Sequence, residues 1–191
     1  MDRIIFINDT ILIQGGTFMS TDNSVTITDM MLCREKRAAI QHQFIEQFHS
    51  TVISFCMNIP GPVKTNADIH TAFEAGCKAI FDTLDADHIT ILDQIMLQEK
   101  TGDELLLCVK ADAPSIKKKM CLIEETHPLG RLYDMDVIDS DRNKLSRNRY
   151  RKCLLCGCQA QECARSRKHS IDEMFAAVMH MIHEWQTTTA S

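Results

Sequence analysis

Residues 127–139 read HPLGRLYDMDVID, and the alternation of polar and apolar residues in this stretch predicts a β-strand with two unlike faces. Side chains two positions apart in an extended chain project from the same face, so Asp134 and Asp136 lie side by side among apolar neighbours. Two carboxylates that close repel each other, and each favours protonation of the other, unless a cation lies between them. The pattern therefore indicates a cation site on one face of this strand.

An Asp-x-Asp pair at a strand end is the arrangement that a magnesium-dependent phosphoryl-transfer site requires. The carboxylates would hold Mg²⁺ against triphosphate oxygens. Gly130 would let a ligand approach the backbone closely, and Arg131 would offer its guanidinium to phosphate. His127, next to the acidic strand, is a further candidate for the site. A solvated strand face gives the same pattern, so that alternative stays open on these residues alone.

The rest of the chain alternates predicted helices and strands. Apolar residues at helical spacing predict helices over residues 34–49, after Asn66, over 113–126 and over 171–185. Runs rich in β-branched and apolar residues predict strands at 51–59, 88–97 and 104–110, the last two forming a hairpin around the turn at 100–103. Residues 1–30 are expected to form a loosely organised leader or a hairpin. This mixture predicts an α/β or α+β fold, with a mixed or mostly antiparallel sheet flanked by helices.

Bulk composition excludes several classes of protein. With 191 residues, 45% of them hydrophobic and 25% charged, the chain has the size and composition of one globular domain. A net charge of −5 argues against a general nucleic-acid binder, which would be basic. No apolar stretch reaches the roughly 18 residues of a membrane span, and no signal-peptide pattern opens the sequence. We therefore expect a cytoplasmic protein whose nine cysteines do not form a disulfide framework.

A basic segment follows the acidic strand and contains a cluster of cysteines. Its cations are Arg142, Lys144, Arg147, Arg149, Arg151, Lys152, Arg165, Arg167 and Lys168. A positive patch on an acidic protein can hold a polyphosphate or dock an acidic partner, although a solvated surface explains it equally well. The stretch CLLCGCQAQECARSRKH, residues 153–169, offers zinc the ligand set Cys153, Cys156, Cys163 and His169. The ligand spacing is shorter than in the usual zinc finger, so packed thiols without metal remain the alternative.

Several of these stretches taken together resemble one family, the apo-citrate lyase phosphoribosyl-dephospho-CoA transferases, also called holo-citrate lyase acyl-carrier-protein synthases. The resemblance lies in HPLGRLYDMDVI, then LSR, RKCLLC and CARSRKH, with REKRAAIQHQF and VISFCMNIPGPVK earlier in the chain. It runs from about Asp29 to beyond His169. It thus implies an N-terminal extension over residues 1–28 and a single transferase domain over 29–187, which includes the Cys-rich basic segment 150–169.

The resemblance implies an activity and its partners. Such enzymes transfer 2′-(5″-triphosphoribosyl)-3′-dephospho-CoA to a serine of the citrate lyase acyl carrier protein, the γ subunit, forming a phosphodiester and releasing pyrophosphate. Their Asp-x-Asp is similar to the metal motif of nucleotidyltransferases related to polymerase β and falls here on Asp134 and Asp136. This chain has Gly130-Arg131 where that superfamily has Gly-Ser, and it shows no obvious third carboxylate.

Within this implied reaction, Asp134 and Asp136 would hold Mg²⁺, and Arg131 would stabilise charge that develops on the transferred phosphate. Three further cations, Lys144, Arg147 and Arg151, would grip the pyrophosphate or guide the acidic carrier protein. Lys64, which follows Pro60-Gly61-Pro62, would reach phosphate from a second wall, and Asp139 is a weak candidate for a general base. Two other classes stay open: a zinc-containing module that binds nucleic acid through the Cys-rich segment, and an accessory protein that docks the carrier without chemistry.

Overall fold

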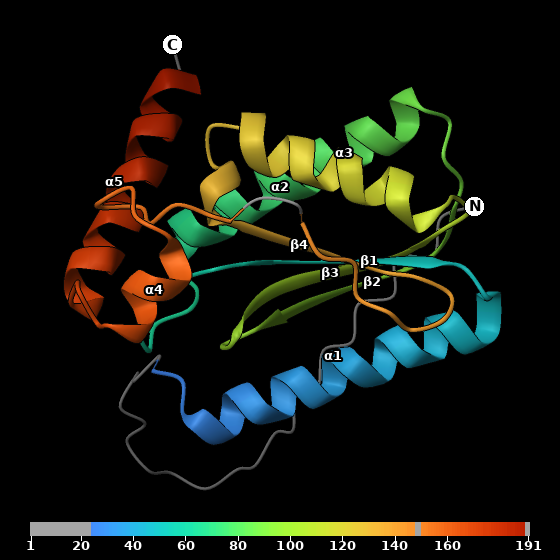
Figure 1. Ribbon diagram of the computed structural model, residues 1–191, viewed down its shortest axis with the longest axis horizontal. Coiled ribbons are helices and arrows are strands. Elements are labelled where there is room, and N and C mark those ends of the chain that lie inside the picture. The colour runs from blue at the N-terminus through green and yellow to red at the C-terminus, as the bar shows by residue number, and fades with distance from the viewer. Residues whose placement is uncertain (1–23, 148–149, 190–191) are drawn as a thin grey trace, which may run out of the picture.

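A four-stranded antiparallel sheet forms the centre of the computed structural model, which describes residues 24–147 and 150–189 (Figure 1). The strands are β1 (Thr51–Met57), β2 (Ile91–Glu99), β3 (Gly102–Val109) and β4 (Tyr133–Ile138). They lie in the order β2-β3-β1-β4, and each neighbouring pair is antiparallel. The predicted class, a sheet flanked by helices, is confirmed.

Helices cover the two faces of the sheet unequally. Figure 1 shows α1 (Ile27–Phe48) lying along one face, and α2 (Ala67–Ala86) and α3 (Ala113–Thr126) on the other. The helix α5 (Ile171–Thr189) packs against α2, and the short helices η1 (Gly130–Leu132) and α4 (Ala160–Arg165) lie at the same end of the molecule. Among the described residues, no helix combines the length and the apolar character that a membrane crossing requires.

The start of α1 differs from the sequence prediction. The Thr26 hydroxyl accepts a hydrogen bond from the Asp29 backbone N–H at 3.1 Å, and the Asp29 carboxylate accepts one from the Thr26 N–H at 2.9 Å. This reciprocal capping box starts the helix at Ile27 rather than at Arg34. The prediction that residues up to 30 form a leader or hairpin is therefore wrong for the described part, while residues 1–23 lie outside the described residues.

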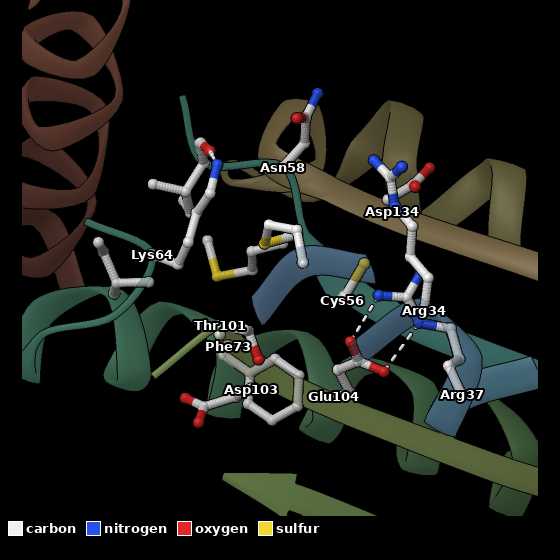
Figure 2. Close-up of a pocket in the computed structure, with 15 residues that line it drawn as sticks. Arg34, Arg37, Cys56, Asn58, Lys64, Phe73, Thr101, Asp103, Glu104 and Asp134 are labelled. Atoms are coloured by element: carbon white, nitrogen blue, oxygen red, sulfur yellow. Dashed lines mark hydrogen bonds and ion pairs between the residues drawn. The ribbon is translucent and has the colours of Figure 1, made fainter. Parts of the chain in front are cut away.

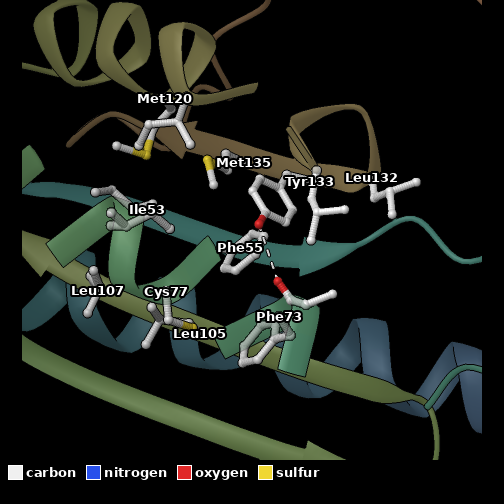
Figure 3. Close-up of a cluster of buried hydrophobic side chains, with 14 of the residues drawn as sticks. Ile53, Phe55, Phe73, Cys77, Leu105, Leu107, Met120, Leu132, Tyr133 and Met135 are labelled. Atoms are coloured by element: carbon white, nitrogen blue, oxygen red, sulfur yellow. Dashed lines mark hydrogen bonds between the residues drawn. The ribbon is translucent and has the colours of Figure 1, made fainter. Parts of the chain in front are cut away.

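One face of β4 is fixed by aromatic packing in the main core (Figure 3). The ring of Phe55 stacks on Phe73 with centroids 4.9 Å apart and meets Tyr133 edge-on at 5.3 Å. The buried Tyr133 hydroxyl donates a hydrogen bond to the Ala72 carbonyl at 3.2 Å. A slip of one residue in β4 would expose Tyr133 and bury the carboxylates, so this packing fixes the register of the strand.

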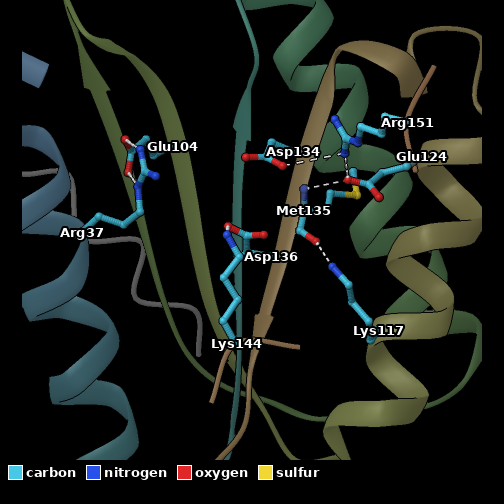
Figure 4. Close-up of polar contacts among 9 residues, drawn as sticks. All are labelled: Arg37, Glu104, Lys117, Glu124, Asp134, Met135, Asp136, Lys144 and Arg151. Carbon is cyan, nitrogen blue, oxygen red and sulfur yellow. Dashed lines mark hydrogen bonds and ion pairs between the residues drawn. The ribbon is translucent and has the colours of Figure 1, made fainter. Parts of the chain in front are cut away.

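The outer edge of β4 is completed by side chains of α3 (Figure 4). Since β4 is the last strand of the sheet, the Met135 backbone groups point away from β1. The Met135 N–H donates to Glu124 Oε1 at 3.0 Å, and its carbonyl accepts from Lys117 Nζ at 3.0 Å. Both side chains are buried, and burial lowers the pKa of Lys117. Two side chains of α3 thus bind the backbone N–H and carbonyl of Met135, the residue between Asp134 and Asp136.

Candidate active site

Asp134 and Asp136 project from the sheet face that α1 covers, as the alternation predicted. Asp134 lies opposite Cys56 of β1, and Cys56 lies opposite Glu104 of β3, so the three side chains form a row across the sheet. Asp136 lies one row further along, opposite Ser54. The sequence alone shows no third carboxylate, but the strand pairing places Glu104 in line with Asp134.

A groove runs between α1 and these rows. We call it the α1 groove and define it by Arg34, Arg37, Lys64, Glu104, Asp134, Asp136 and Lys144. It consists of two adjoining hollows, one above Asp134 and one above Asp136, and both Arg34 and Arg37 line the two hollows. Asp134 therefore lines one hollow of the groove and Asp136 lines the adjoining one, and arginine and lysine side chains line both.

The cations enter the groove from three segments: the helix α1, the loop after β1, and the loop after β4, which carries Lys144. Figure 2 shows Arg34 and Arg37 reaching in from α1, and Lys64 from the loop after β1. Arg37 makes a two-pronged contact with Glu104, from Nε to Oε2 at 2.8 Å and from Nη2 to Oε1 at 2.5 Å. Lys64 donates to the Ile59 carbonyl at 2.6 Å, and burial lowers its pKa. Arg34 is exposed and has no ion-pair partner among the described residues, so its guanidinium is available to a ligand.

Each carboxylate of the pair has one basic neighbour. Lys144 Nζ lies 2.5 Å from Asp136 Oδ2, and Arg151 Nη2 lies 3.7 Å from Asp134 Oδ1 (Figure 4). Cys56, which lies between Asp134 and Glu104 in the first row, is a neutral thiol because burial raises its pKa to about 12. Mg²⁺ prefers carboxylate oxygens, and two of them face the same open groove here, so the donor set fits that ion.

A second, larger cavity of about 710 Å³ lies beside the groove. Its polar wall contains Arg131, Arg151 and Lys152, and its apolar wall comes mainly from α5, α4 and the segment before α4. Asn58 lines both this cavity and the α1 groove, so the two spaces adjoin. Arg131 also donates a hydrogen bond to the Lys152 carbonyl, and burial lowers the pKa of the Arg131 guanidinium. The predicted phosphate ligand Arg131 thus faces this cavity rather than the groove.

Two of the predicted phosphate ligands are bound to a buried carboxylate. Arg147 and Arg151 both form ion pairs with Glu124, whose side chain is 2% exposed. Arg151 reaches the groove through Asp134, whereas Arg147 lies beside α3 and lines neither the groove nor the larger cavity. Glu124 therefore connects the basic segment to the strand that carries the acidic pair.

The structure does not bring His127 or Asp139 to the acidic pair. The ring of His127 packs against Tyr133, with centroids 5.0 Å apart, on the core side of β4, and burial lowers the pKa of His127. The sheet therefore separates it from Asp134 and Asp136. Asp139 accepts hydrogen bonds from the backbone of Asn143 at 2.8 Å and of Asp141 at 2.9 Å. The Asn143 backbone bond is the main cause of its lowered pKa, which makes Asp139 a poor base.

Gly130 is buried against α3 instead of facing a ligand. A Cβ at this position would lie 2.5 Å from the Glu124 carbonyl oxygen and 2.7 Å from that of Ile123. The expected role, close approach of a ligand, is replaced by close approach of the helix backbone. The absence of a side chain here sets how near α3 lies to β4.

The replacement Gly130→Ala should therefore lower the free energy of unfolding by about 1–3 kcal/mol, because a backbone neighbour cannot move aside as a side chain can. Urea denaturation followed by circular dichroism would measure the change. A variant as stable as the original chain would show that α3 and η1 are not in this close contact.

Four potential zinc ligands come together in the Cys-rich segment. The ligand atoms of Cys153, Cys156, Cys163 and His169 all lie within 4.8 Å of one another. The cluster lies beside the larger cavity, which Cys153, Cys163 and His169 line.

Sequence reasoning missed Arg34, Arg37 and Glu104. One signal was present for Glu104, a carboxylate that opens the apolar strand ELLLCV and is 3% exposed in the structure. Arg34 and Arg37 share a helix face at a spacing of three residues, but nothing local distinguishes them from a solvated surface. Only the placement of α1 across the sheet shows what they face.

Comparison with known proteins identifies the family. The family model for apo-citrate lyase phosphoribosyl-dephospho-CoA transferase matches residues 25–185. A Vibrio cholerae protein named "Probable apo-citrate lyase phosphoribosyl-dephospho-CoA transferase" is 38% identical over 169 residues, which cover 86% of this chain and 95% of that protein. The apo-citrate lyase phosphoribosyl-dephospho-CoA transferase of Citrobacter koseri is 30% identical, covering 86% of this chain and 92% of its own. A Streptococcus pyogenes protein with the same name as the Vibrio protein is 34% identical, covering 85% and 88%. The chain therefore belongs to the apo-citrate lyase phosphoribosyl-dephospho-CoA transferase family.

Proposed function

We propose that this chain transfers a phosphoribosyl-dephospho-CoA group to apo-citrate lyase, and that the α1 groove is where the transfer takes place. The donor would be 2′-(5″-triphosphoribosyl)-3′-dephospho-CoA, and the acceptor a serine of the acyl carrier protein, the γ subunit. The observation that carries the proposal is the pair Asp134 and Asp136 on the floor of a groove walled by arginine and lysine side chains. A polyphosphate needs such an arrangement, because its own charge repels a nucleophile.

The bonds that change are few. The serine oxygen forms a bond to the α-phosphorus of the donor, and the bond from that phosphorus to the β-phosphate oxygen breaks. The serine proton passes to water, and pyrophosphate carries away the electron pair of the broken bond. Positioning and charge stabilisation supply most of the rate in such reactions, so the chain's work is to hold the phosphates in line.

The residues of the α1 groove have distinct roles in the transfer reaction. Asp134 and Asp136 would hold Mg²⁺, which when bound neutralises phosphate charge and makes a nearby hydroxyl easier to deprotonate. Arg34 and Lys64 approach the donor phosphates from opposite walls. The Lys144 side chain, which is 63% exposed and pairs with Asp136, would move from Asp136 to the leaving pyrophosphate.

The Arg37 side chain is held more rigidly than the other groove cations, because both oxygens of Glu104 bind its guanidinium. A guanidinium fixed by two hydrogen bonds to a buried carboxylate loses little conformational entropy when a phosphate binds its free edge. The buried Glu104 also receives a hydrogen bond from the Cys33 thiol at 2.9 Å. We infer that Glu104 orients Arg37 toward the triphosphate.

The larger cavity fits the remainder of the donor. Its apolar wall suits the adenine ring or the pantetheine chain, and Arg131 and Lys152 suit the diphosphate between them. Since Asn58 lines both spaces, one extended molecule can occupy the groove and the cavity at once.

The mass of the carrier protein tests the proposed function. The full chain is incubated with triphosphoribosyl-dephospho-CoA, Mg²⁺ and apo acyl carrier protein, and the carrier is then weighed by mass spectrometry while pyrophosphate is assayed. We expect each carrier to gain one phosphoribosyl-dephospho-CoA group and one pyrophosphate to appear for each group gained. A carrier in which the acceptor serine is replaced by alanine serves as the control. An unchanged mass of the intact carrier would overturn the proposed function.

The replacement Arg34→Ala should raise the KM for the donor by about 10- to 100-fold with a smaller change in kcat, because it removes a charged hydrogen bond to bound phosphate. Lys36→Ala is the matched control, since Lys36 lies on the same helix but pairs with Glu99 at 2.6 Å. Steady-state kinetics with both variants would measure the change. Equal KM values for Arg34→Ala and the original chain would place the triphosphate elsewhere.

The other two classes have less support. The names of the relatives describe transferases, and none of those reported above names a nucleic-acid-binding or accessory protein. We also propose a cytoplasmic location, because none of the nine cysteines in the described residues forms a disulfide, as expected in a reducing compartment.

A further inference from the structure

The Cys-rich segment forms a folded unit of its own beside the larger cavity. The Cys153 N–H donates to the Cys158 carbonyl at 2.6 Å, and the Gly157 N–H donates to the Cys153 carbonyl at 3.2 Å. These bonds close a tight turn around Cys156, with Gly157 at a φ of +69° that glycine adopts without strain. Cys163 lies in the helix α4 that follows the turn, His169 comes just after that helix, and both side chains lie next to the turn.

Two short segments, 153–156 and 163–169, together provide four ligand atoms. We propose that Cys153, Cys156, Cys163 and His169 bind one structural zinc ion. Three thiolates and one imidazole form one of the common ligand sets of closed, tetrahedral zinc sites. The spacing between the two halves is shorter than in the usual finger, and the second half is carried by α4, which contains Cys163, and by His169 just after it.

The distances agree with this assignment. All four ligand atoms lie within 4.8 Å of one another, and Sγ of Cys156 lies 3.7 Å from Sγ of Cys163. Zinc–sulfur bonds of about 2.3 Å at tetrahedral angles place two sulfurs about 3.8 Å apart. A disulfide would require about 2.05 Å between the two sulfurs. The cluster therefore has the size of a metal site rather than that of a disulfide.

His169 provides a second, independent observation. Its Nε2 atom is buried and has no hydrogen-bond partner in the part of the chain that the structure describes. A buried polar atom without a partner costs free energy, and coordination of a metal ion removes that cost. The neighbouring Cys158 is exposed and does not belong to the set of four, so the four ligands are distinguished from other thiols by position.

Such an ion would hold the wall of the larger cavity. The Ala160 N–H donates to the Arg151 carbonyl at 2.8 Å, and the Lys152 carbonyl accepts from Arg131. Arg151 in turn contacts Glu124 and Asp134. The metal would thus fix the Cys-rich segment next to the acidic pair. This structural role lies beyond the proposed transfer reaction and does not depend on it.

The zinc content of the purified full chain tests this assignment. We expect about one zinc per chain by inductively coupled plasma mass spectrometry after purification under reducing conditions. Cys156→Ser and His169→Ala should each lose most of it, whereas Cys158→Ser, the matched control two residues from Cys156, should keep it. Absence of zinc from a chain produced with added zinc, equal content in all variants, or a Cys156–Cys163 disulfide in the reduced preparation would overturn the proposal.

Two further measurements cover variants that fail to fold. The original chain, stripped of metal and titrated with Co²⁺, should show the strong ligand-field absorption of a tetrahedral site together with thiolate charge-transfer bands. Trypsin should cut after Arg165, Arg167 and Lys168 faster once a chelator has removed the metal. A Co²⁺ spectrum typical of six oxygen ligands, or cleavage rates that the chelator does not change, would contradict a zinc site. Neither readout depends on transfer activity.

Discussion

Replacing Asp134 with asparagine should lower the rate of transfer by about 10³-fold or more, because a neutral amide cannot share a cation with Asp136 and metal assistance supplies several kcal/mol in such reactions. The fold should survive. The Asp134 side chain is 46% exposed, and its ion pair with Arg151 spans 3.7 Å. Mass spectrometry of the carrier would give the rate, and circular dichroism would give the stability.

The control for this variant is Asp141→Asn, which removes the same charge from an exposed loop that follows the acidic strand. We expect Asp141→Asn to transfer at the original rate and Asp136→Asn to fail as Asp134→Asn does. A near-normal rate for Asp134→Asn would show that the acidic pair has no role in the reaction. The carrier mass could still show that the chain is the transferase.

Glu124→Gln should lower the free energy of unfolding by about 3 kcal/mol, the second large effect. Glutamine can still accept the hydrogen bond from the Met135 N–H, so the variant isolates the loss of charge. Without the carboxylate, Arg147 and Arg151 lose their shared partner, and their side chains are only 25% and 18% exposed. Because this partial exposure lets water screen them, we place the expected effect at the lower end of the range for buried ion pairs.

The adjacent Glu125→Gln is the matched control, because Glu125 is exposed and belongs to the same helix. Urea denaturation should show a change below about 0.5 kcal/mol for this control. Glu124→Gln should also weaken transfer, since Arg151 joins Glu124 to Asp134. If both variants were equally stable, the ion pairs of Glu124 with Arg147 and Arg151 would not stabilise the basic segment.

The elements that follow from local pattern were predictable. The helix at 113–126 was predicted with the bounds that the structure shows, and the alternation around Asp134 and Asp136 placed both carboxylates on one face. Such features depend on spacing within one element, which the sequence displays directly. The start of α1 was missed because the Thr26–Asp29 capping box lies in a stretch of short apolar pieces that also suggested a leader.

Features that depend on packing between helices and strands were harder to predict from the sequence. His127 is near Asp134 in the sequence, but its ring packs against Tyr133, and Asp134, the next residue of β4, projects from the opposite face of the sheet. Arg147 and Arg151 were expected to hold phosphate, and the structure adds that both form ion pairs with a buried carboxylate from α3. No local pattern in the basic segment indicates Glu124.

A crystal of the full chain grown with the donor and Mn²⁺ in place of Mg²⁺ tests the central claim most directly. The anomalous signal of Mn²⁺ locates the ion independently of the protein density. We predict a peak about 2.1 Å from carboxylate oxygens of both Asp134 and Asp136, in contact with the donor triphosphate. A donor bound in the structure with its phosphates and the Mn²⁺ peak away from these two side chains would contradict the account.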